Sequence, residues 1–256
     1  PIIVLEGDNP ITIEVGTAFT DPGATATDNY DEDVTVTTTG TVDVNTVGTY
    51  TLTYTATDSS GNTSSITRIV NVVDTTDPTL VLTGSDLITI EVGTAFTDPG
   101  ATATDNYDED VTVTTTGTVD VNTVGTYTLT YTATDSSGNT SSITRTVNIV
   151  DTTDPIIVLE GDNPITIEVG TAFTDPGATA TDNYDEDITV TTTGTVDVNT
   201  VGTYTLTYTA TDSSGNTSSI TRIVNVVDTT APIIVLEGDN PITIEVGTAF
   251  TDPGAT

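Results

Sequence analysis

Residues 48–73 read GTYTLTYTATDSSGNTSSITRIVNVV, and this stretch decides the fold. From residue 49 to 57 every second residue is Thr, whereas two Tyr, one Leu and one Ala share the opposite face. A period of two over this length is typical of a strand with one buried and one wet face. Asp58 to Asn62 carry the residue types of a tight turn, and an alternating run follows them up to residue 73. The stretch therefore predicts two long strands joined by a turn.

The same stretch returns at a fixed spacing, because the chain consists of three copies of one 77-residue unit and the start of a fourth. Pro1, Pro78, Pro155 and Pro232 open the copies, and the first and third copies differ at only two positions. A fixed period of this kind predicts a tandem array. A third of a unit cannot bury a core, so we interpret the last segment either as part of a longer array or as a strand pair donated to a neighbouring subunit. The expected domains are 1–77, 78–154 and 155–231, with a partial fourth repeat at 232–256.

Five shorter alternating segments precede the long pair within each unit, and Gly, Pro, Asp and Asn separate them. No segment has the pattern of a helix. Seven short strands in one unit indicate an all-β architecture of tandem immunoglobulin-like β-sandwiches. In the first unit the expected strands are 2–5, 11–15, 24–27, 34–39, 41–44, 49–57 and 64–73.

The composition excludes most kinds of active site. The chain has 38 acidic residues against three arginines, a net charge of −35, and it lacks Lys, His, Cys, Met, Trp and Gln. Without His or Lys there is no ordinary general base near neutral pH, and without His or Cys there is no zinc, copper or iron–sulfur site. The negative charge repels nucleic acid and anionic membrane surfaces. We therefore expect a protein that is not an enzyme, with no nucleic-acid partner and no direct membrane contact within these residues.

Two segments resemble known surface repeats. Residues 47–78, VGTYTLTYTATDSSGNTSSITRIVNVVDTTDP, resemble the second half of hyalin-type and bacterial Ig-like surface repeats, and residues 11–33, ITIEVGTAFTDPGATATDNYDED, resemble the first half of the bacterial version. The chain departs from many relatives in lacking Lys and in having Glu32 where a Gly often follows the loop aspartate. The resemblance implies an extracellular or cell-surface prokaryotic protein, although such modules serve in adhesins, secreted enzymes and stalks alike.

The acidic residues gather in loops, and strand parity predicts where these loops lie. If seven strands alternate in direction, the loop 28–33 and the linker 74–77 share the end at which the chain leaves a repeat, facing the turn 135–139 of the next repeat. Carboxylates at such a junction raise one another's pKa or bind a cation, and the oxygen-binding Ca²⁺ fits them. The expected ligands are Asp28, Asp31, Glu32, Asp33, Asp74, Asp77, Asp135 and Asn139 at the first junction, and Asp105, Asp108, Glu109, Asp110, Asp151, Asp154, Asp212 and Asn216 at the second.

These acidic residues also have a plainer interpretation. Asp and Asn in loops can simply form turns and keep the surface soluble, which applies to Asp58 and Asn62 as much as a ligand role does. Asp21 is expected to support the Pro-Gly turn that follows it. Glu14 and Asp43 are expected to be solvated charges in the middle of strands.

Three further features are given structural interpretations. Arg68, an isolated positive charge in the last strand, predicts an ion pair with a nearby carboxylate. Tyr30 in the acidic loop is expected to pack against the junction. The Thr-rich faces are attributed to β-propensity in preference to an ice-binding array or a platform for O-glycans.

These observations predict a calcium-stiffened spacer or filament shaft of a prokaryotic cell-surface protein, whose partners are the neighbouring repeats of the same chain. One alternative is a self-assembling extracellular fibre, in which residues 232–256 complete the sandwich of an identical chain by strand addition. Another is an adhesin module for glycan or ice, which calls for an exposed aromatic cluster or a surface that differs between repeats. A glycoside hydrolase with paired carboxylates is a more distant alternative.

Overall fold

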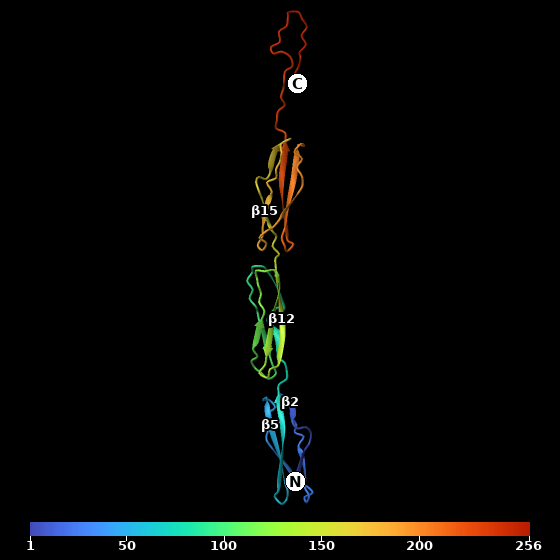
Figure 1. Ribbon diagram of the computed structural model, residues 1–256, viewed down its shortest axis with the longest axis vertical. Helices are drawn as coiled ribbons and strands as arrows, with labels where there is room; N and C mark the ends of the chain where they lie inside the picture. Colours follow the sequence, from blue (N-terminus) through green and yellow to red (C-terminus); the bar gives the residue numbers. More distant parts are fainter. The chain divides into compact units, whose positions relative to one another are not determined.

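The computed structural model describes residues 1–256, and every regular element in it is a strand (Figure 1). The chain divides into two compact units, Pro1–Val150 and Asp151–Thr256. The first unit contains two repeats, with strands β1 (Ile2–Leu5), β2 (Ile11–Glu14), β3 (Ala24–Thr27), β4 (Val36–Thr39), β5 (Gly48–Thr57) and β6 (Thr63–Val73), and then β7 (Thr79–Leu82), β8 (Leu87–Glu91), β9 (Ala101–Thr104), β10 (Val113–Thr116), β11 (Gly125–Thr134) and β12 (Thr140–Val150). The second unit contains the third repeat, with β13 (Ile156–Leu159), β14 (Ile165–Glu168), β15 (Ala178–Thr181), β16 (Val190–Thr193), β17 (Gly202–Thr211) and β18 (Thr217–Val227).

Each repeat is a sandwich of a two-stranded and a four-stranded sheet. In the first repeat β1 pairs with β3, and the larger sheet has the order β2-β6-β5-β4. β5 and β6 are the long antiparallel pair that the sequence predicts, with Gly48 opposite Val72 and Thr57 opposite Thr63. β2 lies on the other edge of β6 and runs parallel to it. The other two repeats have the same order, so the predicted all-β Ig-like architecture is confirmed.

The direction of the first two strands of a repeat corrects one expectation. In the second repeat, Pro78 before β7 accepts a hydrogen bond from Ser141 (2.5 Å), and Thr83 after β7 accepts one from Arg145 (2.6 Å), so β7 runs in the same direction as β12. β8 also pairs with β12 in parallel. The chain therefore crosses from one sheet to the other between β7 and β8 without turning back. The strict alternation of direction from which the loop positions were predicted is wrong.

Asn9 attaches this crossover to β6 in the first repeat. Its side chain donates a hydrogen bond to the carbonyl of Thr67 (3.0 Å) and accepts one from the N–H of Ile69 (2.9 Å). These two bonds hold the segment along β6 as a paired strand would. Pro10, which has no backbone N–H, lies between Asn9 and the first residue of β2. The segment 6–10 is thus a bridge between two sheets and not a hairpin loop.

The corrected directions bring the acidic loop and the 58–62 turn of a repeat to the same end. β3 runs antiparallel to β1, so the loop 28–33 that follows β3 lies where the chain enters the repeat. Asp31 in this loop accepts hydrogen bonds from the N–H and the hydroxyl of Ser59 (both 2.8 Å). The prediction that this loop lies at the outgoing end, beside the linker 74–77, is therefore wrong.

Residues 41–44 form no strand, so each repeat has six strands and not about seven. Gly40 ends β4 with a φ of +103°, and a Cβ at this position would lie 2.4 Å from a backbone carbonyl oxygen of β5. Asp43 then begins a turn, because its carboxylate accepts hydrogen bonds from the N–H of Asn45 (3.0 Å) and the hydroxyl of Thr46 (2.8 Å). Asp43 is therefore a turn residue, and the prediction of a solvated charge within a strand is wrong.

The core lies between the two sheets. Leu52, Tyr54 and Val70 are its buried centre in the first repeat, and Ile3 and Leu5 of the smaller sheet pack against them. Each fully buried aliphatic side chain contributes about 2 kcal/mol of stability. The equivalent residues form the core of the third repeat. The alternating face that the sequence predicts for β5 is the buried face.

Each sandwich also buries an arginine. Arg68 has no exposed surface, its Nη1 lies 3.0 Å from Asp21 Oδ1, and its guanidinium lies 5.6 Å from the centroid of the Tyr54 ring. Asp21 Oδ1 accepts further hydrogen bonds from the Tyr54 hydroxyl (2.6 Å) and from the N–H of Gly23 (3.1 Å). Burial, the hydrogen bond to Asp21 and the charge of Asp21 raise the pKa of Tyr54 to about 12. The predicted ion pair of Arg68 and the predicted turn role of Asp21 are confirmed.

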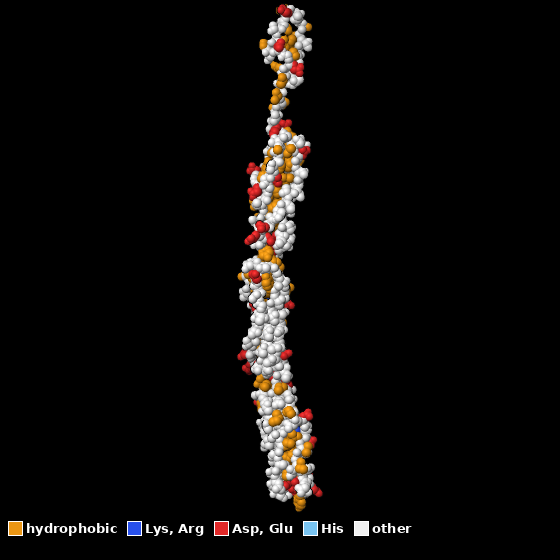
Figure 2. Space-filling view, in the orientation of Figure 1, with side chains coloured by type: hydrophobic (Ala, Val, Ile, Leu, Met, Phe, Trp, Pro, Cys, Tyr) orange, Lys and Arg blue, Asp and Glu red, His pale blue; other side chains and the backbone are white.

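The arginines of the other repeats are buried in the same way, with Arg145 beside Asp98 and Arg222 beside Asp175. Because these are the only three basic side chains in the sequence, the charged surface is acidic. Figure 2 shows acidic side chains distributed over the visible face. Cations that neutralise this surface must come from the solution.

Residues 232–256 do not form a sandwich. Their β pairing is limited to a bridge between Leu236 and Ala255. Their aliphatic side chains are largely exposed, with 85% of Ile233 and 76% of Ile234 accessible. The prediction that a third of a unit cannot bury a core of its own is confirmed.

Candidate metal centre

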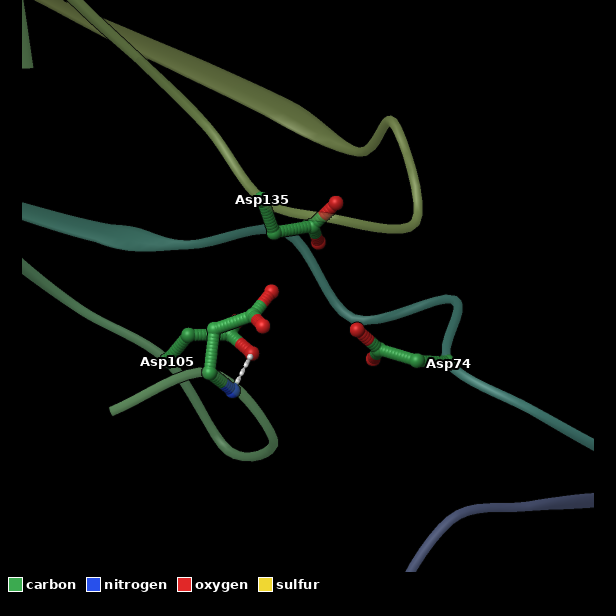
Figure 3. Close-up of side chains that lie close together, drawn as sticks. Asp74, Asp105 and Asp135 are labelled. Atoms are coloured by element: carbon green, nitrogen blue, oxygen red, sulfur yellow. Dashed lines mark hydrogen bonds between the residues drawn. The ribbon is translucent and has the colours of Figure 1, made fainter. Parts of the chain in front are cut away.

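Four carboxylates meet beside the linker that joins the first two repeats. Asp74 follows β6, Asp105 and Asp108 lie in the loop after β9, and Asp135 follows β11. One oxygen of each residue lies within 4.8 Å of the corresponding oxygens of the others. Figure 3 shows Asp74 on the linker facing Asp105 and Asp135 on two other segments. A second group of the same kind lies in the second unit and consists of Asp151, Asp182, Asp185 and Asp212.

Hydrogen bonds fix the two carboxylates of the loop after β9. Asp105 Oδ2 accepts bonds from the N–H groups of Tyr107 (2.9 Å) and Asp108 (3.2 Å). Asp108 in turn accepts bonds from the N–H (2.7 Å) and the hydroxyl (2.8 Å) of Ser136. The loop and the turn after β11 are thereby held together by the second repeat itself. In the third repeat, equivalent bonds hold Asp182 and Asp185.

Asp135 is buried, and Asn139 holds its charge. Asn139 donates hydrogen bonds to Asp135 from its backbone N–H (2.8 Å) and from its side-chain amide (2.7 Å). Burial acts to raise the pKa of Asp135. The hydrogen bonds from Asn139 and from the backbone N–H groups of Gly138 and Ser137 outweigh this effect, so the pKa lies below its ordinary value. Asp212 and Asn216 have the same arrangement. These two aspartates are therefore ionised at neutral pH.

Asp74 is the member of the group whose charge the protein compensates least, because burial raises its pKa more than the hydrogen bonds from Thr76 and from the Ser137 side chain lower it. Its side chain is only 6% exposed; Oδ1 accepts a hydrogen bond from the N–H of Thr76 (3.3 Å), whereas the buried Oδ2 has no hydrogen-bond partner. Burial is the main cause that raises the pKa of Asp74, and the charges of Asp105 and Asp135 raise it further. Asp151 shares the burial, the unpartnered Oδ2 and the raised pKa. A buried carboxylate oxygen without a donor is costly, so a cation would stabilise the ionised form.

The donor set suits a hard cation. The four residues offer carboxylate oxygens only, and the chain has no imidazole or thiolate that could compete for a softer metal. Carboxylate oxygens are the ligands that Ca²⁺ and Mg²⁺ prefer in proteins. The unpartnered oxygen of Asp74 distinguishes this group from an acidic surface whose oxygens are hydrated.

The structure brings part of the predicted ligand set together. Six of the predicted aspartates belong to the two groups, and the two asparagines donate hydrogen bonds to aspartates within them. These eight residues are Asp74, Asp105, Asp108, Asp135 and Asn139, and Asp151, Asp212 and Asn216.

The other predicted ligands lie outside the two groups. Asp28 and Asp31 are at the incoming end of the first repeat, where Asp28 Oδ1 lies 3.1 Å from the amino group of Pro1. Asp77 is exposed, which agrees with the Ala231 found at the equivalent position of the third copy. The remaining predicted ligands are also exposed, namely Glu32, Asp33, Glu109, Asp110 and Asp154.

The predicted set omits Asp182 and Asp185, which belong to the second group. The signal for them was present, because the acidic loop of the third repeat is a copy of the first. The wrong strand direction assigned that loop to the outgoing end of its repeat. With the correct direction, each linker meets the acidic loop of the repeat that follows it.

The loop tyrosine of the second repeat lies at the junction of the first unit. Tyr107 is half-buried and lines a groove with Val15, Gly16 and Thr17 of the first repeat. Tyr30, its equivalent in the first repeat, is 83% exposed. The predicted packing of Tyr30 is therefore wrong, although its equivalent adjoins the preceding repeat.

Each sandwich corresponds to one match of a family model. The model described as bacterial surface protein, Ig-like domain, matches residues 3–72, 80–149 and 157–226. The chain belongs to this family. The family resemblance predicted from residues 11–33 and 47–78 is therefore confirmed. No helix of the structure has the length and apolar character needed to cross a membrane.

The chain is also similar to curated proteins from several sources. The chain is 38% identical to hyalin of Lytechinus variegatus over 95% of its own length and 51% of that protein. It is 38% identical to hyalin of Strongylocentrotus purpuratus, covering 80% of the chain and 19% of that protein. It is also 32% identical to an uncharacterized 81.3 kDa protein of Acholeplasma phage L2, covering 76% of the chain and 28% of that protein. The chain thus spans about half the length, or less, of these curated relatives.

Solved structures with tandem extracellular domains are more distantly similar. Cadherin domains 3–6 of protocadherin gamma B2 are 16% identical, with a TM-score of 0.36 over 93% of this chain and 76% of that chain. Domains EC1-4 of Drosophila N-cadherin are 14% identical, with a TM-score of 0.31 over 86% of this chain and 73% of that chain. Likeness at this level carries no information about the carboxylate groups.

Proposed function

We propose that the chain is a non-enzymatic extracellular spacer or filament shaft of a prokaryotic cell-surface protein, stiffened by Ca²⁺ bound beside its linkers. The observation that carries this proposal is the buried Oδ2 of Asp74. This oxygen has no hydrogen-bond partner, and three other carboxylates lie close to Asp74. Asp151 repeats the observation in the second unit. A buried carboxylate oxygen that recurs without a hydrogen-bond partner supports a cation-binding role.

Calcium is the cation that this donor set favours. Ca²⁺ accepts six to eight oxygen ligands from carboxylates, backbone carbonyls and water in flexible geometry. Mg²⁺ demands a nearly ideal octahedron and keeps several of its waters. Four carboxylates from three separate segments form an irregular group, which suits the more tolerant ion.

Binding at such a group would join separate segments. Asp74 belongs to the linker, whereas Asp105, Asp108 and Asp135 belong to the second repeat. A cation among them replaces mutual repulsion by attraction and attaches the linker to the repeat that follows. Attachment of each linker in this way reduces its freedom and stiffens the array.

The family and the relatives support the proposed location and role. The matching model describes a bacterial surface protein, and 38% identical relatives are hyalins. Copies as similar as the first and the third suit a spacer, because duplication changes its length without a new design. The neighbouring repeats of the same chain are then its main partners.

Thermal unfolding of the full chain in excess Ca²⁺ and in chelator tests the calcium proposal. At a free concentration of about 100 times Kd, one bound ion adds about 2.7 kcal/mol, which raises the melting temperature of a domain of this size by roughly 10–20 °C. The double variant Asp74→Asn, Asp151→Asn should lose this gain. The matched control Asp33→Asn, Asp110→Asn changes two exposed carboxylates and should keep it. Equal melting of the unchanged chain in both conditions would sink the proposal.

Small-angle X-ray scattering tests the stiffening separately. We expect the distance distribution of the full chain to extend to a larger maximum dimension in Ca²⁺ than in chelator, because a stiff array is more extended on average than a flexible one. The Asp74→Asn, Asp151→Asn variant should resemble the chelated chain in both conditions. If Ca²⁺ binds but the scattering does not change, the calcium site is supported and its stiffening role is contradicted.

A further inference from the structure

Glu14, at the end of β2, holds the linker that follows β6. Its carboxylate accepts hydrogen bonds from the N–H of Thr75 (2.9 Å), the hydroxyl of Thr75 (2.7 Å) and the hydroxyl of Thr76 (2.9 Å). The backbone bond from Thr75 is the main cause that lowers the pKa of Glu14. The prediction that Glu14 is a solvated charge is therefore wrong. Glu14 lies outside both carboxylate groups, yet it holds the linker by these bonds and its side chain also contacts that of Asp74.

The same contacts form at the linker after β18, which is not followed by a carboxylate group. Glu168 accepts hydrogen bonds from the N–H of Thr229 (2.9 Å), the hydroxyl of Thr229 (2.7 Å) and the hydroxyl of Thr230 (2.9 Å). The linker residue Asp228 is exposed there, because only the partial copy follows it. The contacts of the glutamate thus depend on its own repeat and its own linker, and not on a carboxylate group beyond them.

One peptide group of the linker is held from two sides. The N–H of the peptide between Asp74 and Thr75 bonds to Glu14 in the first repeat (2.9 Å). The carbonyl of the same peptide accepts a bond from the side chain of Asn139 in the second repeat (3.2 Å). Asp74, which carries the unpartnered Oδ2, is the residue on the carbonyl side of this peptide. Holding the peptide therefore limits where the Asp74 carboxylate can point.

We propose that Glu14 is a positioning residue for the first carboxylate group, of which it is not a member. By holding the N–H of the Asp74–Thr75 peptide, Glu14 orients the Asp74 carboxylate before a cation binds. This orientation raises the affinity of the group for the cation. This inference rests on the proposed calcium function, because it concerns the same site. The first repeat would in this way prepare a ligand for the site of the second repeat before an ion arrives. The expected effect is that of a residue that orients a metal ligand, whose loss lowers metal affinity about 10-fold to 100-fold.

Titration of the full chain with Tb³⁺ and competition with Ca²⁺ tests this inference, with the tyrosines as sensitisers. The variants carry Asp151→Asn as well, so that the first group dominates the signal. Glu14→Gln keeps the length of the side chain and one acceptor, and we expect it to lower the affinity about tenfold. Thr75→Val removes only the hydroxyl bond and should have a smaller effect in the same direction. Glu168→Gln makes the same chemical change at a linker with no following group, and it should leave the affinity unchanged.

Two further measurements separate positioning from direct ligation and from a loss of folding. The number of waters on bound Tb³⁺, from lifetimes in H₂O and D₂O, should stay constant in Glu14→Gln and rise in Asp74→Asn. Amide hydrogen exchange at Thr75 without metal should be slow in the unchanged chain and faster in Glu14→Gln. Thr75→Val, which leaves every carboxylate in place, provides the affinity comparison if Glu14→Gln unfolds the first repeat.

The outcomes distinguish this inference from the function on which it rests. An unchanged chain that binds neither Tb³⁺ nor Ca²⁺ overturns the calcium function and the positioning role together. If Glu14→Gln and Thr75→Val both bind the metal with the affinity of the unchanged chain, the positioning role alone is overturned. An additional metal-bound water in Glu14→Gln also overturns it, because Glu14 would then be a ligand.

Discussion

The Arg68–Asp21 pair and the Asp74 group both contain buried charges, but the chain balances only the first with a charge of opposite sign. Asp21 has a guanidinium nitrogen 3.0 Å away and a tyrosine hydroxyl as donor, whereas Asp74 is surrounded by carboxylates and has an oxygen with no donor. All three arginines lie inside sandwiches, so none is left for the linkers. The comparison shows that the chain itself balances the charge inside a repeat, whereas it leaves the carboxylates beside the linkers without a basic partner.

The largest expected effect concerns the inner pair. Arg68→Met removes the buried cation and leaves Asp21, whose side chain is 27% exposed, without its charged partner. Removal of one partner of a buried pair costs about 3–5 kcal/mol, and the exposure of Asp21 places the expected loss at the lower end. Chemical denaturation of the full chain should show this loss for the first repeat, equally in Ca²⁺ and in chelator. The double variant Arg68→Met, Asp21→Asn should recover part of it. A loss that disappears on addition of Ca²⁺ would contradict the separation of the two kinds of charge.

The next effect concerns the number of sites. The two carboxylate groups predict two calcium sites in this chain, each adding about 2.7 kcal/mol at 100-fold excess over Kd. Asp212→Asn removes a ligand of the second group only, so calorimetry should report one strong site in place of two. The matched variant Asp58→Asn changes the equivalent aspartate of the first repeat, which belongs to neither group. Its stoichiometry should equal that of the unchanged chain.

A smaller effect has opposite signs in the two conditions. Two carboxylates 4.8 Å apart repel each other by about 1 kcal/mol in a water-like dielectric, and Asp74 lies within this distance of three others. Asp74→Asn should therefore raise the melting temperature in chelator and lower it in Ca²⁺. Differential scanning calorimetry in both buffers measures the two signs. Destabilisation in both buffers would mean that Asp74 is held by its hydrogen bonds and not opposed by its neighbours.

The smallest effect is a dependence on pH in the absence of metal. Burial raises the pKa of Asp74 above its ordinary value of 3.8. Its contribution to stability is therefore fully present below pH 3.8 and is lost as the pH rises through the folded-state pKa. Melting temperatures in chelator should fall with rising pH more in the unchanged chain than in Asp74→Asn, Asp151→Asn. In saturating Ca²⁺ this extra fall should vanish, because binding holds both residues ionised.

The sequence predicts those features that depend on short-range pattern. The alternation in residues 49–57 predicts β5 and its buried face, and the isolation of Arg68 predicts an ion pair. The acidic loop and the linker likewise predict two crowded groups of carboxylates. In the first two cases the residues that decide the outcome lie close together in the chain or are the only ones of their chemical type. The carboxylate groups were predicted with the wrong acidic loop beside each linker.

The predictions that failed depend on contacts between distant residues. The direction of β2 depends on its parallel pairing with β6, in which Ile11 lies opposite Val70, and no local pattern indicates this pairing. Glu14 resembles a solvated charge because Thr75, its partner, is 61 residues away. One wrong direction moved every acidic loop to the other end of its repeat. It therefore assigned Glu32 and Asp33 to a site and omitted Asp182 and Asp185.

The straight crossover at residues 6–10 divides each group of four carboxylates between two repeats, and the 77-residue period keeps the group complete. It places three carboxylates of a site at the incoming end of a repeat and leaves one for the linker at the outgoing end. Any stretch of 77 residues, wherever it begins, therefore encodes one full set of four within the array. Unequal recombination between copies can insert or delete whole periods at any breakpoint, and every internal site that remains is complete.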